Sequence, residues 1–328
     1  MNEVAGRDTT TSDAIAENSI RDSPAVLPQV AQTPAPGALH ENDSRESDSP
    51  HNTPTVVIQP TQGWLDLNLS EVWRYRELLM ALAMRDIKLR YRQTAMGASW
   101  VVLQPLLSAG IFTIVFGKIA RLETGGVPPF LFYYAAMLGW NTFSATLSKA
   151  SSCIVGNSGL IAKIYFPRLI LPFSVIFSTL LDFAVAFAVM IVLLLAYHVP
   201  LTWGILLLPV WLVLLCFCAM GIGLIASALM VTYRDVTHIL QVATSLLMYG
   251  SAVVFSLDEA LRRTNPQFHI FFYANPLVSL IEAFRWSLLG SGTILLLPLI
   301  WAAVFSFGIF FAGMIAFHSK ERLFADAI

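Results

Sequence analysis

The sequence RDIKLRYRQTAMGASWVVLQP, residues 85–105, holds the join on which the rest of the chain depends. A basic segment there runs directly into a long apolar stretch, and its cations are Arg85, Lys88, Arg90 and Arg92. Lys and Arg beside an apolar span mark the cytoplasmic end of a transmembrane helix, because cations are retained on that side. The indole of Trp100 suits the headgroup layer, with its ring in lipid and its N–H near water. The stretch therefore predicts the point at which the chain enters a membrane.

The composition is that of a membrane protein. Of 328 residues, 56% are hydrophobic and only 12% charged, whereas a soluble domain has about a quarter charged residues. The net charge of −1 conceals two unlike parts: residues 1–63 hold nine of the 21 acidic residues and three of the 20 basic ones. The remainder therefore carries an excess of cations, which suits an anionic inner leaflet.

Residues 1–63 predict a disordered cytoplasmic tail. They contain seven prolines and no aromatic residue, so they bury too little apolar surface to offset the entropy of ordering. A mere linker is the main interpretation, and a short docking motif around residues 56–58 is the alternative. The segment has no apolar core long enough for a signal peptide.

Residues 64–96 predict an amphipathic interface helix. At about 100° per residue, four cations share one narrow arc and apolar side chains lie opposite; the cations are Arg74, Arg85, Lys88 and Arg92. Such a helix lies on the cytoplasmic leaflet and reaches a partner. An ordinary amphipathic helix without a partner has the same spacing.

Residues 97–328 predict an all-α membrane domain of six transmembrane helices. Each apolar span reaches the roughly 20 residues that a bilayer requires; the spans are 98–120, 129–150, 168–197, 204–231, 237–257 and 293–317. With both termini in the cytoplasm, twelve basic residues fall on inner segments and five on outer ones. This distribution follows the rule that cations stay inside.

Two connections on the predicted inner side carry candidate functional residues. The loop 156–172 mixes apolar side chains with Lys163 and Arg168, which indicates a short helix whose apolar face docks on another protein. Packing against the chain's own helices is the alternative. The second connection is the charged turn Tyr233, Arg234 and Asp235.

The outer connection, residues 258–292, is too apolar for a plain loop. After Asn275 and Pro276, an apolar run contains only Glu282 and Arg285 as charges. The run is too short to cross a bilayer and suits a re-entrant or periplasmic helix. Three residues apart, Glu282 and Arg285 are expected to pair on one helix face.

Several motifs, in order, resemble permease subunits of type-2 ABC exporters for cell-surface polysaccharides. Residues 90–94, RYRQT, with Gly97, Trp100 and a Gln-Pro pair at 104–105, are similar to that family's opening signature. Residues 157–168 resemble its N-x-x-L-I-x-K-x-x-F-P-R motif, and Tyr-Arg-Asp, Asn-Pro-Leu and Glu-x-x-Arg elements follow at 233, 275 and 282. The closing Phe-Ala-Asp at 324–326 extends the resemblance over roughly residues 64–328.

The resemblance implies a role for each of these segments. The ATPase-coupling segment consists of Asn157, Leu160, Ile161, Lys163, Ile164, Tyr165, Phe166, Pro167 and Arg168. The interface helix and entrance consist of Trp73, Arg85, Lys88, Arg90, Tyr91, Arg92, Gly97 and Trp100. The inner turn is Tyr233, Arg234 and Asp235, and the outer mouth is Asn275, Pro276, Glu282 and Arg285.

The implied function is export of a lipid-linked, O-antigen-like polysaccharide across the bacterial inner membrane. Two copies of the chain are expected to join two ABC ATPase subunits, which bind ATP and Mg. This chain has no G-x-x-x-x-G-K-[ST] phosphate loop and no metal-ligand constellation, so we expect no catalysis, no cofactor and no nucleic-acid partner. An exporter of a small lipid or drug is the alternative, and a membrane scaffold or lipid-modifying enzyme is a further one.

Aromatic faces stack on sugar rings while allowing sliding, so four aromatic residues of the second span are candidates for a polymer conduit: Tyr133, Tyr134, Trp140 and Phe143. Lipid-facing and core positions are the alternative for each of them. Asp182 is the one acidic residue well inside a span, where a carboxylate is either functional or bonded to a neighbouring helix. The three cysteines, Cys153, Cys216 and Cys218, are interpreted as small core residues.

Overall fold

The computed structural model describes residues 69–92 and 99–327, and within these ranges the chain is helical or turns between helices. The predicted tail at 1–63 and Gly97 lie outside the described residues, and the side chains of Arg90, Tyr91 and Arg92 are likewise not described. The expectation of an all-α protein is confirmed for the described part of the chain.

The helices follow one another with short connections. Those of the first half are α1 (Leu69–Arg74), α2 (Arg76–Arg92), α3 (Ser99–Phe112), the π-helical η1 (Thr113–Ile119), α4 (Pro129–Gly156), α5 (Ser158–Ile161) and α6 (Ile170–Ala196). Those of the second half are η2 (Trp203–Leu207), α7 (Leu208–Met230), α8 (Val236–Tyr249), α9 (Leu257–Arg263), η3 (Pro266–Phe268), α10 (His269–Ala274), α11 (Pro276–Leu289) and α12 (Leu296–Ala327).

Local chemistry explains several helix ends. Pro129 and Pro276 occupy the first positions of α4 and α11, where the missing N–H has no partner to lose. The side chain of Asn275 caps α11 by accepting a hydrogen bond from the backbone N–H of Leu277 at 3.0 Å. Gly290 ends the same helix with φ of 66°, a left-handed conformation that glycine adopts without steric cost.

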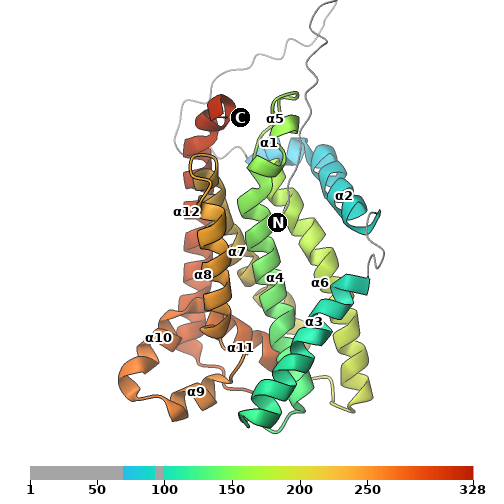
Figure 1. Ribbon diagram of the computed structural model, residues 1–328, viewed down its shortest axis with the longest axis vertical. Coiled ribbons are helices and arrows are strands. Elements are labelled where there is room, and N and C mark those ends of the chain that lie inside the picture. The colour runs from blue at the N-terminus through green and yellow to red at the C-terminus, as the bar shows by residue number, and fades with distance from the viewer. Residues whose placement is uncertain (1–68, 93–98, 328) are drawn as a thin grey trace, which may run out of the picture. The chain divides into compact units, whose positions relative to one another are not determined.

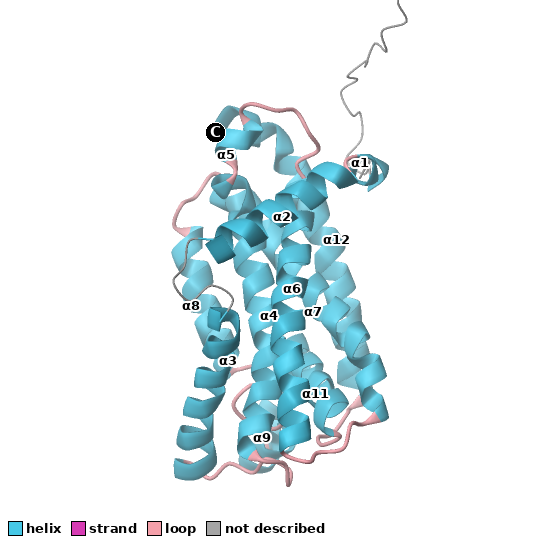
Figure 2. Ribbon diagram, turned by 90° about the vertical axis from the view of Figure 1, so that its right-hand side faces the viewer, coloured by secondary structure: helices cyan, strands magenta, loops and turns pink. Residues whose placement is uncertain are grey.

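The long helices run side by side, and the short ones gather at the two ends of the bundle. Figure 1 shows α1, α2 and α5 at one end, together with the end of α12, and α9, α10 and α11 at the opposite end. Figure 2 shows α2 lying across the bundle instead of along it. The interface-helix segment, the predicted coupling loop and the turn between α7 and α8 therefore share one end, and the predicted outer connection occupies the other.

The centre of the bundle is α7, which packs closely against α4 and α12. A Cβ atom at Gly221 would overlap the backbone of Ile309 in α12, and one at Gly313 would overlap the backbone of Gly221. A Cβ at Gly223 would lie 2.7 Å from the Cβ of Ala150 in α4. Small residues let membrane helices approach closely, so the Gly221–Gly313 crossing sets the distance between α7 and α12.

Four helices of the described residues are long and apolar enough to cross a membrane: 99–119, 170–196, 203–230 and 296–321. The helix α4 is also long, with 28 residues, but it carries more polar side chains. The predicted span at 237–257 is shorter than expected, because α8 has 14 residues. That is about 21 Å of helix against a hydrocarbon core of about 30 Å.

The reason why α8 ends early lies in another helix. Arg285 of α11 donates hydrogen bonds to the backbone carbonyls of Ala252 and Phe255. Ala252 also has φ of 55°, which a right-handed helix does not accommodate. The segment after Tyr249 is therefore wrapped onto α11 and cannot extend the helix.

Candidate functional site

The predicted coupling segment, residues 157–168, joins α4 to α6 and contains the single turn α5. Its middle faces outward, since Ile164 is 53% exposed and Tyr165 78% exposed, and Lys163 is exposed beside them. Phe166 is buried, and Leu160 and Ile161 are half-buried against the same apolar cluster. The segment therefore exposes Ile164 and Tyr165, while Phe166 beside them is buried against the bundle.

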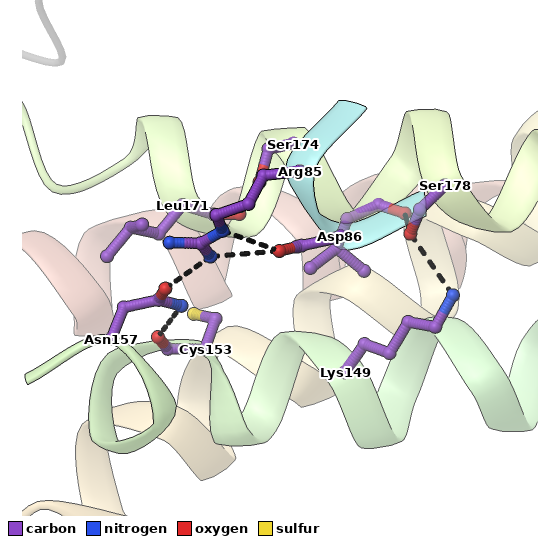
Figure 3. Close-up of polar contacts among 9 residues, drawn as sticks. Arg85, Asp86, Lys149, Cys153, Asn157, Leu171, Ser174 and Ser178 are labelled. Carbon is purple, nitrogen blue, oxygen red and sulfur yellow. Dashed lines mark hydrogen bonds and ion pairs between the residues drawn. The ribbon is translucent and has the colours of Figure 1, made fainter. Parts of the chain in front are cut away.

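A polar network fixes the first residue of this segment, as Figure 3 shows. The side chain of Asn157 donates to the carbonyl of Cys153 at 2.8 Å and accepts from Nη2 of Arg85 in α2 at 2.6 Å. Arg85 is itself paired with Asp86, with Nη2 to Oδ1 at 2.8 Å. Two groups of predicted residues, those of the interface helix and those of the coupling loop, thus meet directly.

The last residue of the segment is held by another helix. The backbone N–H of Arg168 donates to a carboxylate oxygen of Glu321 in α12 at 3.4 Å, and the Arg168 guanidinium donates to the Glu321 carbonyl. The second carboxylate oxygen of Glu321 lies 3.1 Å from Nδ1 of His318. The sequence offers no local signal for this contact, which joins residues 153 positions apart.

Asp182 bonds a neighbouring helix, as one of the two sequence interpretations expected. Its Oδ2 lies 3.2 Å from Nζ of Lys149 in α4, and the same ammonium donates to the hydroxyl of Ser178 at 3.1 Å. The carboxylate is therefore neutralised by a cation inside the bundle, which removes most of the cost of an intramembrane charge.

A cavity of about 480 Å³ opens between α3, α4, α6 and α8, and Asp182 lies on its wall. Its lining is rich in hydroxyl and amide groups, which include Gln104, Asn141, Thr142, Ser144, Ser148, Thr179, Thr237, Gln241, Thr244 and Ser245. Some of these hydroxyls donate to their own helix, as Thr142 does to the carbonyl of Leu138 at 2.8 Å. Their oxygens still accept hydrogen bonds, so the wall offers many weak polar contacts with little net charge.

The four aromatic residues predicted to line a conduit are not among the residues that line this cavity. Tyr133, Tyr134 and Phe143 are completely buried, and Trp140 is 4% exposed. They occupy the face of α4 that packs in the main apolar core with residues of α7 and α11, so within the single chain they do not line the 480 Å³ cavity. The polar face of α4 that lines the cavity was not predicted, although residues 141, 144, 148 and 152 follow the helical period of 3.6.

The remaining candidates divide between surface and core. Those on the surface are Trp73, Lys88, Trp100, Tyr233, Arg234 and Asp235, which are all exposed. At the opposite end, Glu282 and Arg285 form the expected pair at 3.1 Å and are both buried. Asn275 adds a hydrogen bond from its amide to the carbonyl of Gly250 at 3.0 Å. The predicted outer-mouth residues therefore hold α11 to the segment that follows α8.

A helical membrane bundle with a polar cavity and an exposed apolar connection at one end has features of a transport protein. The chain belongs to the ABC-2 type transporter family, whose pattern matches residues 77–289. It is 29% identical over 262 residues to the O-antigen export system permease protein RfbA of Myxococcus xanthus, covering 79% of this chain and 98% of that protein. A protein of the same name from Klebsiella pneumoniae is 27% identical over 64% of this chain and 79% of its own length. The polysialic acid transport protein KpsM of Escherichia coli is 24% identical over 74% of this chain and 93% of its own length.

Proposed function

We propose that the chain is the membrane subunit of an ATP-driven exporter that moves a lipid-linked cell-surface polysaccharide across the bacterial inner membrane. The observation that carries this proposal is the hydroxyl- and amide-lined cavity between α3, α4, α6 and α8. Many weak, nearly uncharged hydrogen-bonding groups suit a sugar polymer that must slide, because no single contact holds it tightly. The names of the relatives, O-antigen export and polysialic acid transport, support the same substrate class.

The proposal also includes a separate energy source and an assembly of two copies. The sequence has no phosphate loop, so ATP and Mg are bound by a separate ABC ATPase, which docks on residues 157–168. Helices α3 and α8, which border the cavity, expose apolar side chains that include Leu107, Ile111, Ile239, Val242 and Leu246. A second copy of the chain placed against them closes the cavity into a conduit, and each copy engages one ATPase.

The topology completes this proposal. Six helical segments cross the membrane: α3 continued by η1, α4, α6, α7, α8 together with the segment that follows it to residue 255, and α12. Helix α2 lies on the cytoplasmic leaflet, and both ends of the chain are on that side. The concentration of cations on the connections at the end that holds α2 and the coupling segment supports this orientation. The short helices α9–α11 then face the periplasm or dip back from it.

The first prediction tests the cavity and therefore the proposed function. Ser148 and Gln241 both line the cavity and are exposed to it, so the double variant Ser148→Leu/Gln241→Leu should lower polysaccharide export about tenfold. Two lost hydrogen bonds of about 0.7 kcal/mol each, within the range of a net hydrogen bond, account for a tenfold effect. The measurement is the amount of polymer reaching the outer surface of cells that carry the variant as their sole copy.

The control for this prediction is Val192→Leu, because Val192 is 64% exposed on α6 and is not a cavity residue. Unchanged export in the cavity variant would contradict the proposal. The other contrary outcome is a strain without the gene that keeps its surface polysaccharide and loses export of a small lipid or drug. That result would replace the polysaccharide exporter by the alternative class, an exporter of a small lipid or drug.

The second prediction concerns the docking segment. The double variant Ile164→Asp/Tyr165→Asp should lose copurification with the ATPase, because two exposed apolar contacts become carboxylates that must be desolvated on binding. Both side chains are exposed in the chain, so insertion and folding should be unaffected. Gly159→Ala in the same segment is the control, since a methyl group there meets open space. Normal copurification of the double variant would exclude this segment as the docking site.

The third prediction concerns topology. Cysteines introduced by Gln267→Cys and Thr293→Cys should react with a membrane-impermeant thiol reagent in spheroplasts, and one introduced by Lys320→Cys should not. Gln267 in η3 and Thr293 just after α11 are exposed and belong to the group of short helices at one end of the bundle, whereas Lys320 is in the last turns of α12, which end at the opposite end. The reverse pattern of labelling would invert the chain in the membrane.

A further inference from the structure

The docking segment is fastened at both ends, and the two anchors belong to different helices. At its start, Arg85 of α2 donates to Asn157. At its end, Arg168 bonds Glu321 of α12. Between the anchors, Ile164 and Tyr165 remain exposed. The middle of the docking segment is therefore accessible to a partner, while both of its ends are bonded to the bundle.

The first anchor has a specific geometry. Asn157 ends α4 with non-helical backbone angles, φ −116° and ψ 21°, and its side-chain amide turns back to the Cys153 carbonyl. This bond leaves the amide oxygen pointing toward α2, where Arg85 reaches it at 2.6 Å. Asp86 aligns the guanidinium through both Nε, at 3.1 Å, and Nη2, at 2.8 Å. A charge-assisted bond of this kind is stronger and more directional than a neutral one.

The second anchor uses both the backbone and the side chain of Arg168, so it fixes the chain direction at the start of α6 as well as the position of the side chain. Glu321 is in turn oriented by His318 one turn earlier in α12. Buried Phe166 fills the space between the segment and the apolar cluster beneath it. Displacing the end of the segment therefore means moving α12 or breaking these bonds.

The two anchored helices lead to different parts of the bundle. Helix α2 packs mainly on α6, and α12 mainly on α7. The α6 helix supplies Thr179 and Asp182 to the cavity wall, while α12 is locked to α7 at the Gly221–Gly313 crossing. The first anchor therefore connects the docking segment to a helix that packs on the cavity wall, and the second connects it to the pair of α7 and α12.

We propose that the Arg85–Asn157 and Arg168–Glu321 contacts are positioning contacts that convert movement of the docked ATPase into movement of α2 with α6 and of α12 with α7. This inference rests on the proposed docking of an ATPase at residues 157–168. Arg85 and Arg168 then determine how much polymer is exported per ATP hydrolysed. The exposed residues between the anchors determine the affinity of the permease for the ATPase.

The test uses the complete transporter reconstituted in proteoliposomes with its ATPase and polymer substrate. Arg85→Ala and Arg168→Ala should each lower the polymer exported per ATP hydrolysed about tenfold, within the usual range of coupling between sites, while the ATPase still copurifies. Asn157→Asp loses the donor to the Cys153 carbonyl but gains a charged acceptor for Arg85, so it should retain more coupling than Asn157→Leu, which should behave like Arg85→Ala. Met84→Ala and Lys320→Ala are the matched controls, because these exposed side chains neighbour the anchors.

A second measurement needs neither ATPase nor polymer. A nitroxide attached through Ile164→Cys reports the mobility of the docking segment in the permease alone. The native Cys153, Cys216 and Cys218 are buried and do not compete for the label. The nitroxide spectrum should show faster motion in the Arg85→Ala and Arg168→Ala backgrounds than in the two control backgrounds.

The outcomes separate this inference from the proposed function. Unchanged mobility together with an unchanged export-to-ATP ratio would overturn the positioning role. Loss of ATPase copurification in the arginine variants would also overturn it, because these residues would then belong to the docking surface. If the native transporter exports no polysaccharide, the proposed substrate is wrong. The nitroxide spectra still decide whether the two anchors restrict the mobility of the docking segment.

Discussion

Replacing Gly221 by leucine should prevent recovery of a folded protein from the membrane. Any side chain at Gly221 meets the backbone of Ile309 and Phe310 in α12, which cannot move aside as a flexible side chain would. Gly313 faces Gly221 across the same crossing, so the two helices must separate along much of their length. Overpacking by single methylenes costs about 1–3 kcal/mol, and a leucine adds several carbons at once.

The measurement is the fraction of monodisperse protein after detergent extraction and its thermal unfolding midpoint. Gly308→Leu is the matched control, because Gly308 lies in α12 five residues before Gly313 and a Cβ there meets open space. We expect the control to extract normally. Equal recovery of the two variants would show that α7 and α12 are not held together by the glycine crossing.

Arg285→Ala should have the second largest effect on stability. The guanidinium is completely buried, pairs with Glu282 at 3.1 Å and lies 3.9 Å from the centre of the Phe132 ring. It also donates hydrogen bonds to the backbone carbonyls of Ala252 and Phe255, which lie beyond the end of α8. Removing it leaves a buried carboxylate and unsatisfied carbonyls, and breaking a buried pair in this way costs about 3–5 kcal/mol.

Two further variants identify the cause of this loss. Arg285→Met/Glu282→Gln removes both charges and should recover part of the lost stability, since no unpaired charge remains. Arg262→Ala removes an exposed ion pair with Glu123 and should change stability by less than about 1 kcal/mol. If Arg285→Ala unfolded at the same temperature as Arg262→Ala, the buried pair would have no structural role.

Local sequence was sufficient wherever the controlling interaction is short-ranged. Proline and asparagine at 275–276 mark the start of α11, and the three-residue spacing of Glu282 and Arg285 gave their ion pair. The exposed middle of 157–168 could also be predicted, because its apolar residues are bounded by Gly159 and Pro167 and interrupted by Lys163. Each of these features depends on residues within about one or two helical turns.

The functional assignment of the aromatic residues could not be made in the same way. A tyrosine or tryptophan in an apolar span has the same local pattern whether it faces lipid, a conduit or the core. The packing of α4 against α7 and α11 decided that Tyr133, Tyr134, Trp140 and Phe143 lie inside. It also turned the Ser, Thr and Asn face of α4 toward the cavity.

The sequence by itself determined the composition of a membrane protein, the resemblance to type-2 exporters and the approximate positions of the long apolar helices, because hydropathy and helix capping act over short separations. Only the tertiary structure decided that α8 ends at Tyr249, that Asp182 is neutralised by Lys149 and that residues 157–168 are bonded to α2 and α12. These contacts join residues between 30 and 153 positions apart. A separation of that size leaves no periodic trace in the sequence, since the partners meet only after whole helices have packed.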